Sequence, residues 1–306
     1  MSESRNSVQN IWGERTPFYG CGEWPARVDY RISEEPDRWV QSACVLCSNG
    51  CGLDIGTKDG RIVGVRGRAA DAVNRGRLGP KGLHGWEANA SPDRLTRPLI
   101  RQAGRLQKAT WDEALELITR RTREVRDRYT GSAIGFYTSG QLFLEEYYTL
   151  GMIGKAGLGT PHMDGNTRLC TATAAAALKE TFGADGQPGC YFDIDETECM
   201  VMVGHNMAST DTVLWMRVLD RRRGSKPPKL IVIDPRATTT AKEADIHLAP
   251  RVGSNVALLN GILHLIVENG SVDREFIETH TVGFEELRRP WKHTRLPGPR
   301  RYLACP

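Results

Sequence analysis

The chain has 306 residues, a formal net charge of +4, and 40% hydrophobic and 25% charged residues, which is typical of a globular protein of about two domains. So mild an excess of positive charge does not indicate nucleic-acid binding, and no apolar run is long enough to predict a membrane span. Residues 1–9 contain neither an apolar signal sequence nor a twin-arginine signal, so we expect a cytoplasmic protein. Eight cysteines in that compartment favour metal ligands, reactive thiols and core residues over a disulfide framework.

Three of these cysteines, Cys44, Cys47 and Cys51, are separated by two and three intervening residues, which is close enough for their sulfur atoms to face one soft metal centre. Three interpretations are open: inert cysteines of the core, a zinc site, or an iron–sulfur cluster. Zinc is weakened because no fourth Cys or His follows at the spacing of a zinc finger. The pattern therefore favours an iron–sulfur cluster.

Residues 1–37 are rich in Gly, Pro, Arg and aromatic side chains without a sustained period, which predicts an irregular arm. Its Cys21 is expected to be a structural thiol. Short strands follow at 53–55 and 61–65, joined by a tight Asp-Gly turn into a hairpin. The glycine-rich loop 74–82 comes next, and its simplest interpretation is a solvated surface turn.

Helices and short apolar strands alternate after this loop. Thr110 and Glu113 form a capping box that predicts a helix ending near Gly131. Further helices are expected at 145–155, 171–182, 212–223, 256–268 and 273–280. Strands are expected at 133–137, 199–203 and 229–233. The fold class is therefore α/β: a small N-terminal β-rich domain, followed by a doubly wound parallel sheet covered by helices on both faces.

Ligands of parallel sheets bind at the carboxyl ends of the strands. The loops 204–209 and 234–240 lie there, and their small and hydrogen-bonding residues suit phosphates and sugars. No glycine fingerprint for dinucleotides and no P-loop is present, so nothing indicates ordinary dinucleotide or ATP chemistry. The stretch 288–306 carries six basic residues, four prolines and no acidic residue, which is unlike the end of an α/β domain.

These motifs, in this order, resemble the N-terminal part of the molybdopterin oxidoreductases of the dimethyl-sulfoxide-reductase superfamily, above all the assimilatory nitrate reductases, the periplasmic nitrate reductases and the formate dehydrogenases. Cys44, Cys47 and Cys51 match the first three ligands of that family's iron–sulfur cluster. Lys81 matches the lysine between the cluster and the nearer pterin, and 91–98 matches the segment that closes the cluster domain.

The stretches 139–141 and 164–170 resemble those that lead into the active site of nitrate reductases. The resemblance implies that Cys170 ligates molybdenum, with Asn166 and Arg168 beside it. Without the resemblance, Cys170 reads as a buried core cysteine; with it, a position just ahead of a helix N-terminus suits a thiolate. Loops resembling those that hold the guanine-dinucleotide tails contain Gly204, Asn206, Asp234, Arg236, Thr238, Gly253 and Asn255. Relatives usually carry Asp at the position of Asn255.

The chain departs from the family at Gly79, where the fourth cysteine of the cluster is expected. Three outcomes follow: a 3Fe-4S cluster, a 4Fe-4S cluster completed by His84, Cys21 or solvent, or no cluster. The resemblance implies domains at 38–100 (iron–sulfur) and 101–287 (molybdopterin-binding and incomplete). It ends there, and we interpret 288–306 as a non-homologous tail produced by a frameshift or a gene-model error.

The resemblance implies an oxidoreductase that contains molybdenum and molybdopterin guanine dinucleotide and reduces nitrate to nitrite by oxygen-atom transfer. Electrons would come from a donor protein or reductase subunit and enter through the iron–sulfur cluster. Formate oxidation is the alternative within the same class of enzyme. An inactive fragment without a complete cofactor site is the alternative outside it, because a truncated sheet would expose apolar surface.

Overall fold

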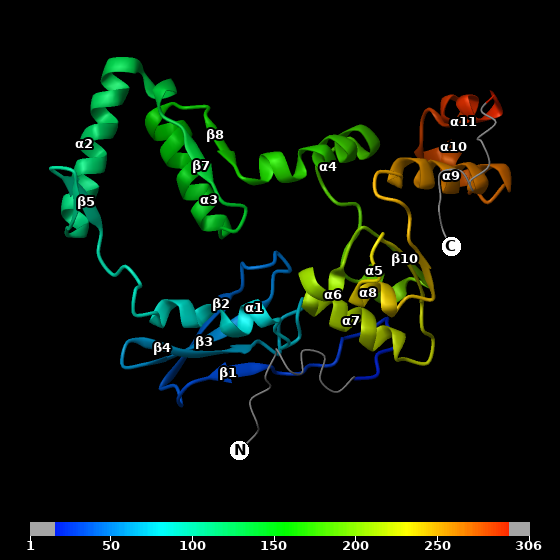
Figure 1. Ribbon diagram of the computed structural model, residues 1–306, viewed down its shortest axis with the longest axis horizontal. Helices are drawn as coiled ribbons and strands as arrows, with labels where there is room; N and C mark the ends of the chain where they lie inside the picture. Colours follow the sequence, from blue (N-terminus) through cyan, green and yellow to red (C-terminus); the bar gives the residue numbers. More distant parts are fainter. Residues whose placement is uncertain (1–15, 294–306) are drawn as a thin grey trace.

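The computed structural model describes residues 16–293, except for the side chains of 289–293. Figure 1 shows an N-terminal β domain, an arch of helices that rises from it, and a parallel sheet with helices packed against it. This mixed α/β architecture, with its β-rich N-terminal part, confirms the predicted fold class.

Four antiparallel strands form the sheet of the β domain in the order β1-β4-β3-β2. They are β1 (Tyr30–Ile32), β2 (Arg38–Ala43), β3 (Gly52–Lys58) and β4 (Arg61–Gly67). The hairpin of β3 and β4 confirms the prediction, since Asp59 and Gly60 have φ of +49° and +74°, the left-handed values that a two-residue turn needs.

The segment predicted as an irregular arm belongs in part to this domain. Strand β1 pairs with β4, so the prediction is wrong for these residues. Phe18 and Trp24 are 4% and 1% exposed, because their large apolar surfaces fill the core between the β domain and the helix that follows the parallel sheet's first strand. Residues 1–15 lie outside the described part of the chain.

The β domain ends in two short helical segments and a second hairpin. The segments are α1 (Pro80–His84) and a 3₁₀ turn (Gly85–Ala90), and the hairpin strands are β5 (Leu99–Gln102) and β6 (Arg105–Lys108). Helix α2 (Trp111–Tyr129) then begins at the predicted capping box. The Glu113 amide donates to Thr110 Oγ1 at 3.2 Å, and the Thr110 amide donates to Glu113 Oε2 at 2.7 Å, as the sequence predicts.

The arch continues through two short strands and two helices. They are β7 (Phe136–Thr138), α3 (Leu144–Gly151) with a π-helical turn (Met152–Leu158), β8 (Met163–Gly165) and α4 (Thr167–Phe182). The prediction of a buried strand at 133–137 is wrong, because β7 pairs only with β8 in a separate two-stranded sheet and Tyr137 is 80% exposed. Strands of three residues are too short to bury a face of their own.

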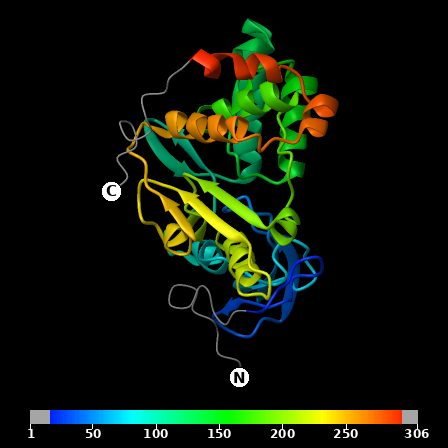
Figure 2. The same cartoon turned by 90° about the vertical axis from the view of Figure 1, so that its right-hand side faces the viewer.

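The parallel sheet has the order β11-β10-β9. Its strands are β9 (Cys199–Val203), β10 (Lys229–Ile233) and β11 (Ile246–Leu248). One face packs on α6 (Met207–Thr210), α7 (Thr212–Arg222) and α8 (Thr239–Lys242) through a core that includes Trp215, Leu230 and Val232, with α5 (Asp193–Glu196) beside α7. Figure 2 shows these helices below the sheet and α9 above the ends of its strands.

The other face of the sheet is less covered than predicted. Val201 and Val203 on β9 are 56% and 45% exposed, whereas Met200 between the helices and the sheet is 9% exposed. The prediction of helices on both faces is therefore wrong for β9 within the described residues, because these two side chains on the second face stay about half exposed.

Three helices complete the described chain: α9 (Asn255–Glu268), α10 (Arg274–His280) and α11 (Phe284–His293). The predicted change of character at residue 288 falls inside α11, and residues 294–306 lie outside the described part. Within residues 16–293 we find no helix that is both long and apolar enough to cross a membrane.

Candidate functional site: a three-cysteine cavity

Cys44, Cys47 and Cys51 line one cavity of about 150 Å³. The β domain contributes the cysteine loop and the start of α1, and the parallel-sheet domain contributes α6 and the start of α7. The other lining residues are Leu78, Gly79, Pro80, Lys81, Gly82, Ser209, Thr210, Thr212 and Val213. The cavity therefore lies where the two predicted domains meet.

The cysteine loop joins strands β2 and β3 and is closed by their pairing. The Cys44 amide donates to the Cys51 carbonyl at 2.8 Å, which brings the two ends of the loop together. Ser48 and Gly50 have φ of +55° and +80°, and these left-handed turns fold the intervening residues back on themselves. The spacing of the cysteines thus becomes a common orientation toward the cavity.

Loop 74–82 is largely buried, with Lys81 its exposed residue, so its interpretation as a solvated turn is wrong. Asn74 and Arg77 are 0% exposed. The Asn74 side chain donates to the carbonyls of Gly52 and Arg77, at 2.9 and 2.7 Å, and accepts from the Gly52 amide at 3.2 Å. Because a buried amide needs partners for both its oxygen and its nitrogen, these bonds hold the loop against the strand that follows Cys51.

Burial changes the chemistry of the thiols. It raises the pKa of Cys51, and the neighbouring Cys47 and Cys44 raise it further. Burial also raises the pKa of Cys47, while a backbone hydrogen bond from Asn49 and the charge of Lys81 act in the opposite direction. Buried thiols of this kind become thiolates when a bound cation compensates their charge.

The arrangement suits a cluster of several metal atoms better than one ion. Among residues 16–288, no three His, Cys, Asp or Glu side chains lie close enough together to hold a single metal ion. Three cysteines that share one cavity match an iron–sulfur cluster, in which each thiolate binds a different iron atom. The mononuclear zinc interpretation therefore finds no support in the described residues.

Gly79 forms the wall of the cavity where a fourth cysteine is expected. Its φ of −76° and ψ of 170° are open to any residue, and a Cβ built on it would lie 3.4 Å from Thr212 Cβ. The two protein ligands considered as substitutes do not line the cavity. His84 Nδ1 pairs with Glu87 at 3.3 Å, and Cys21 Sγ donates to Glu196 at 2.8 Å.

The residues expected around molybdenum share one turn of the arch. Helix α4 begins at Thr167 instead of the predicted 171, so Cys170 lies in its first turn; the interpretation of this thiol as a core cysteine is wrong, since it is exposed. The Gly140 amide donates to Asn166 Oδ1 at 2.9 Å, and Arg168 Nε pairs with Asp164 at 2.8 Å. Because β7 and β8 pair, loop 139–141 lies beside this turn.

Two hydrogen bonds connect distant segments to the cysteine loop. Gln141 Nε2 donates to the Leu46 carbonyl at 2.8 Å, which links the loop beside Asn166 to the residue before Cys47. Tyr191 Oη, in the connection between α4 and α5, donates to the Asn49 carbonyl at 3.0 Å. The cysteine loop is thus bonded to one residue before α4 and to one residue after it.

The residues expected at the guanine-dinucleotide tails gather at the carboxyl ends of the parallel strands. Asn206, after β9, accepts from the Thr240 hydroxyl at 3.0 Å, which ties this loop to the one after β10. Asp234 accepts from the Arg236 amide at 2.8 Å, and the Arg236 side chain is 75% exposed. The Thr238 hydroxyl caps α8 by accepting from Ala241 at 3.1 Å.

The remaining residues of this set have special backbone positions. Gly204 and Gly253 have φ of +62° and +89°, so both loops turn where a side chain would be strained. Asn255 is the first residue of α9 and is exposed. The structure therefore brings the β9 and β10 loops into contact, and places Gly253 and Asn255 on the segment that follows β11.

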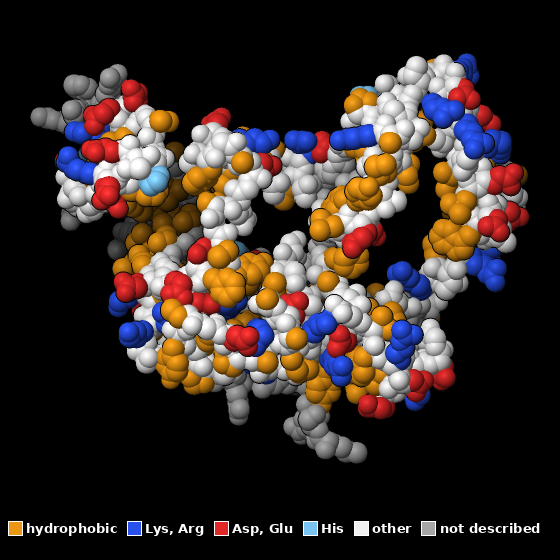
Figure 3. All heavy atoms as spheres, turned by 180° about the vertical axis from the view of Figure 1, so that it is seen from behind, with side chains coloured by type: hydrophobic (Ala, Val, Ile, Leu, Met, Phe, Trp, Pro, Cys, Tyr) orange, Lys and Arg blue, Asp and Glu red, His pale blue; other side chains and the backbone are white. Residues whose placement is uncertain are grey.

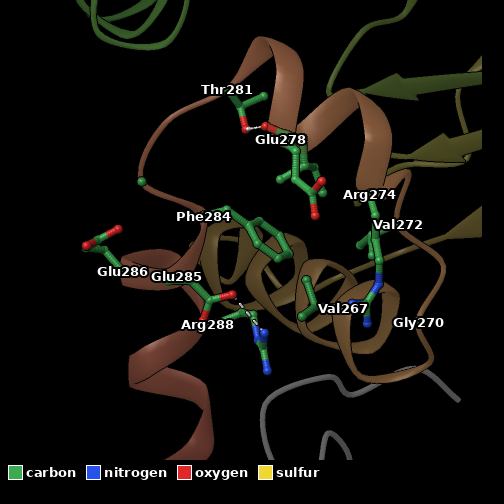
Figure 4. Close-up of a pocket in the computed structure, with 12 residues that line it drawn as sticks. Val267, Gly270, Val272, Arg274, Glu278, Thr281, Phe284, Glu285, Glu286 and Arg288 are labelled. Atoms are coloured by element: carbon green, nitrogen blue, oxygen red, sulfur yellow. Dashed lines mark hydrogen bonds and ion pairs between the residues drawn. The ribbon is translucent and has the colours of Figure 1, made fainter.

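A larger hollow, of about 480 Å³, lies among α9, α10 and α11. Figure 4 shows Phe284 and Val267 among the residues that line it, together with the Glu285–Arg288 ion pair. It contains none of the predicted site residues, and its lining offers no cysteine or histidine. The three clustered cysteines line the smaller cavity instead.

Comparison with known families decides the relationship. The Molybdopterin oxidoreductase family matches residues 94–286, and the Molybdopterin oxidoreductase Fe4S4 domain family matches residues 37–90. The chain belongs to the molybdopterin oxidoreductases. The family consists of enzymes whose cofactors are molybdenum, a molybdopterin and an iron–sulfur cluster, and the predicted membership of the dimethyl-sulfoxide-reductase superfamily is confirmed.

Individual relatives of this molybdopterin oxidoreductase are named either nitrate reductases or formate dehydrogenases. A nitrate reductase of Symbiobacterium thermophilum is 37% identical over 86% of this chain and 35% of its own length. A periplasmic nitrate reductase of Desulfovibrio desulfuricans is 38% identical over 76% of this chain and 31% of its own length. The α subunit of an F420-dependent formate dehydrogenase of Methanococcus maripaludis is 36% identical over 82% of this chain and 36% of its own length.

A solved structure supports the fold of the molybdopterin oxidoreductase. The acetylene hydratase of Pelobacter acetylenicus superposes with a TM-score of 0.71 at 24% identity, over 87% of this chain and 37% of that protein. The chain thus spans about a third of the length of the relatives it matches.

Sequence reasoning missed several residues that shape the cavity of this molybdopterin oxidoreductase. Thr212 and its neighbours on α6 and α7 lie more than 120 residues from the cysteines, and no local pattern signals their approach. Asn74 and Arg77 carried a usable signal, because polar residues within a glycine-rich loop next to a metal motif often hold that loop in place.

Proposed function

We propose that this chain is the cluster-binding and pterin-contacting part of a molybdenum oxidoreductase that reduces nitrate to nitrite. The observation that carries the proposal is the cavity in which Cys44, Cys47 and Cys51 meet Lys81 at the junction of two domains. Two relatives named nitrate reductases support the choice of substrate. When bound, molybdenum supplies the two-electron oxygen-atom chemistry.

In this proposal, each of the chain's own site residues has a separate role. The three thiolates hold the iron–sulfur cluster, and the Lys81 ammonium beside them favours the reduced cluster, because its positive charge compensates an added electron. Cys170 would ligate molybdenum from the first turn of α4, where Asn166 fixes the neighbouring loop through Gly140. The exposed Arg168 would attract an anionic substrate.

The loops after the parallel strands would hold the dinucleotide tails. Gly204, Gly253 and Asn255 offer exposed backbone and amide groups, and the exposed Arg236 guanidinium suits a phosphate. Asn206 and Thr238 contribute indirectly in this arrangement, because their side chains already bond within the loops. We propose an electron-donor protein or reductase subunit as partner, which would approach the cluster from the β domain.

The test is to express the 306-residue chain in a host that makes molybdopterin guanine dinucleotide, and to measure molybdenum, pterin and nitrate-dependent oxidation of a reduced viologen dye. The proposal expects stoichiometric molybdenum and activity that C170S abolishes, with an unchanged iron content. Iron without molybdenum would reduce the chain to a cluster-binding fragment and contradict the catalytic proposal.

Formate oxidation is the second candidate, favoured by the relatives named formate dehydrogenases. The same preparation distinguishes the two, because formate would then reduce an oxidised dye, and nitrate would not reoxidise a reduced one. The sequence around Asn166 and Cys170 supports nitrate.

A further inference from the structure

The cavity has three thiol corners and one corner without a ligand atom. Gly79 stands at that fourth corner, and the nearest atoms to a Cβ placed on it belong to Thr212, with carbon atoms at 3.4 and 3.9 Å and the hydroxyl oxygen at 3.8 Å. The backbone of Gly79 is extended, so the glycine is not required by its conformation. The Cβ of a cysteine would fit there at ordinary contact distances, and without a thiolate the corner is open to a molecule from solution.

No protein group in the described lining replaces the missing thiolate. The Lys81 ammonium is a cation, and most other lining groups beyond the cysteines are apolar or hydroxyl-bearing. The Ser209 hydroxyl accepts from Asn206 at 2.9 Å, and the Thr210 hydroxyl donates to Asp211 at 2.8 Å. Thr212, which begins α7, is left as the hydroxyl beside the open corner.

We infer that the chain holds a 4Fe-4S cluster through Cys44, Cys47 and Cys51 alone, and that the fourth iron, at the Gly79–Thr212 corner, binds an exchangeable ligand from solution. Hydroxide and small thiolates are the ligand class, because a ferrous or ferric ion and the partial positive charge at the start of α7 both favour an anion. The Thr212 hydroxyl hydrogen-bonds that ligand. This inference rests on the cluster binding contained in the proposed function.

An iron atom to which no side chain of the protein is bound is released when the cluster is oxidised. The cluster 4Fe-4S with charge 2+ gives up one Fe²⁺ and one electron, the electron going to an added one-electron oxidant such as ferricyanide, and becomes 3Fe-4S with charge 1+. Added Fe²⁺ and one electron from dithionite reverse the step. A fourth cysteine ligand would hold this iron and oppose its loss.

The experiment reconstitutes the 306-residue chain anaerobically with iron and sulfide and treats it with one equivalent of ferricyanide. The wild type is expected to change from about 4:4 to about 3:4 in iron to sulfide, to show the electron paramagnetic resonance of a 3Fe-4S cluster, and to recover with Fe²⁺ and dithionite. Added 2-mercaptoethanol should alter the Mössbauer signal of one iron before oxidation.

Two variants provide matched controls. G79C should keep four irons after ferricyanide, and 2-mercaptoethanol should not change its Mössbauer signal. G79A, which adds a methyl group but no ligand, should behave as the wild type does. T212V should speed iron release, because the ligand loses its hydrogen bond. Circular dichroism of each variant before reconstitution checks the fold.

Two results overturn the inference in distinguishable ways. A wild type that retains all four irons as firmly as G79C shows that another group fills the corner, and leaves the proposed function intact. A wild type that binds no iron, while G79C binds four, shows that three thiolates do not suffice, and removes the electron-entry step from the proposed function as well.

Discussion

The buried ion pair between Arg77 and Asp220 joins the cysteine-bearing domain to α7, and replacing Asp220 with Asn should weaken that junction. Both side chains are 0% exposed, with Arg77 Nη2 3.3 Å from Asp220 Oδ2. Trp24 Nε1 donates to the same oxygen at 3.0 Å, and the Arg77 guanidinium stacks on the Trp24 ring at 3.7 Å. Arg77 directly precedes Leu78 and Gly79 of the cavity wall.

The substitution D220N keeps the shape of the side chain and removes its charge. Burial lowers the pKa of Arg77 to about 10, while Asp220 opposes that shift, so Arg77 stays charged at pH 7 and loses its buried counterion. Removing one partner of a buried pair costs about 3–5 kcal/mol. The lower end, about 3 kcal/mol, is expected here because Asp29 also favours the charged form of Arg77.

Urea unfolding followed by tryptophan fluorescence and circular dichroism measures this loss. With a slope of about 3 kcal/mol per molar urea, the midpoint should fall by about 1 M. The control E124Q removes an exposed charge that pairs with Arg120 and Arg121 on α2, and should change stability by less than about 1 kcal/mol. A midpoint for D220N that matches that of E124Q would refute the reasoning.

Three further predictions concern charge, reactivity and solubility. K81M should lower the midpoint potential of the bound cluster by on the order of 50 mV, about 1 kcal/mol for one electron, whereas K81R should not; redox titration measures both. The hydrogen bond to Glu196 raises the pKa of Cys21, so less thiolate forms at pH 8. E196Q should therefore speed iodoacetamide labelling of Cys21. The labelling rates of wild type and variant should become equal at a pH above the Cys21 pKa of both proteins. Leu115 and Ile118 on α2 are 54% and 60% exposed, so the paired substitution L115K/I118K should reduce self-association in sedimentation velocity without changing iron content.

Apolar surface is a general property of the arch. Figure 3 shows hydrophobic side chains along its inner side, facing the rest of the molecule. Leu144, Tyr148 and Leu169 are 83%, 71% and 94% exposed, far more than helices of a closed domain leave uncovered. The chain spans about a third of its relatives' length.

Local patterns predicted much of the fold. The capping box at Thr110 and the turn at Asp59 and Gly60 fixed the start of α2 and the hairpin of β3 and β4, because both depend on contacts between near neighbours in sequence. The strands β9 and β10 followed from continuous apolar runs. The start of α4 was predicted four residues late, because residues 167–170 carry no strong helix signal.

Long-range contacts could not be predicted in this way. The burial of Trp24 depends on Asp220 and Arg77, and no short motif connects these three residues. The approach of Thr212 to Gly79 depends on how the two domains dock. The roles assigned to Cys170, Lys81 and the dinucleotide loops stay predictions, as do the domain boundaries, the frameshift at residue 288 and the cytoplasmic location.

The most direct test of the account is whether the three clustered thiols bind iron. Iron and acid-labile sulfide should be measured per chain after anaerobic reconstitution of the wild type and of the triple variant C44S/C47S/C51S, with C199S as a control in an exposed cysteine. The account predicts an iron–sulfur cluster in the wild type and in C199S, and none in the triple variant. Equal iron and sulfide in the triple variant, or none in the wild type, would contradict it.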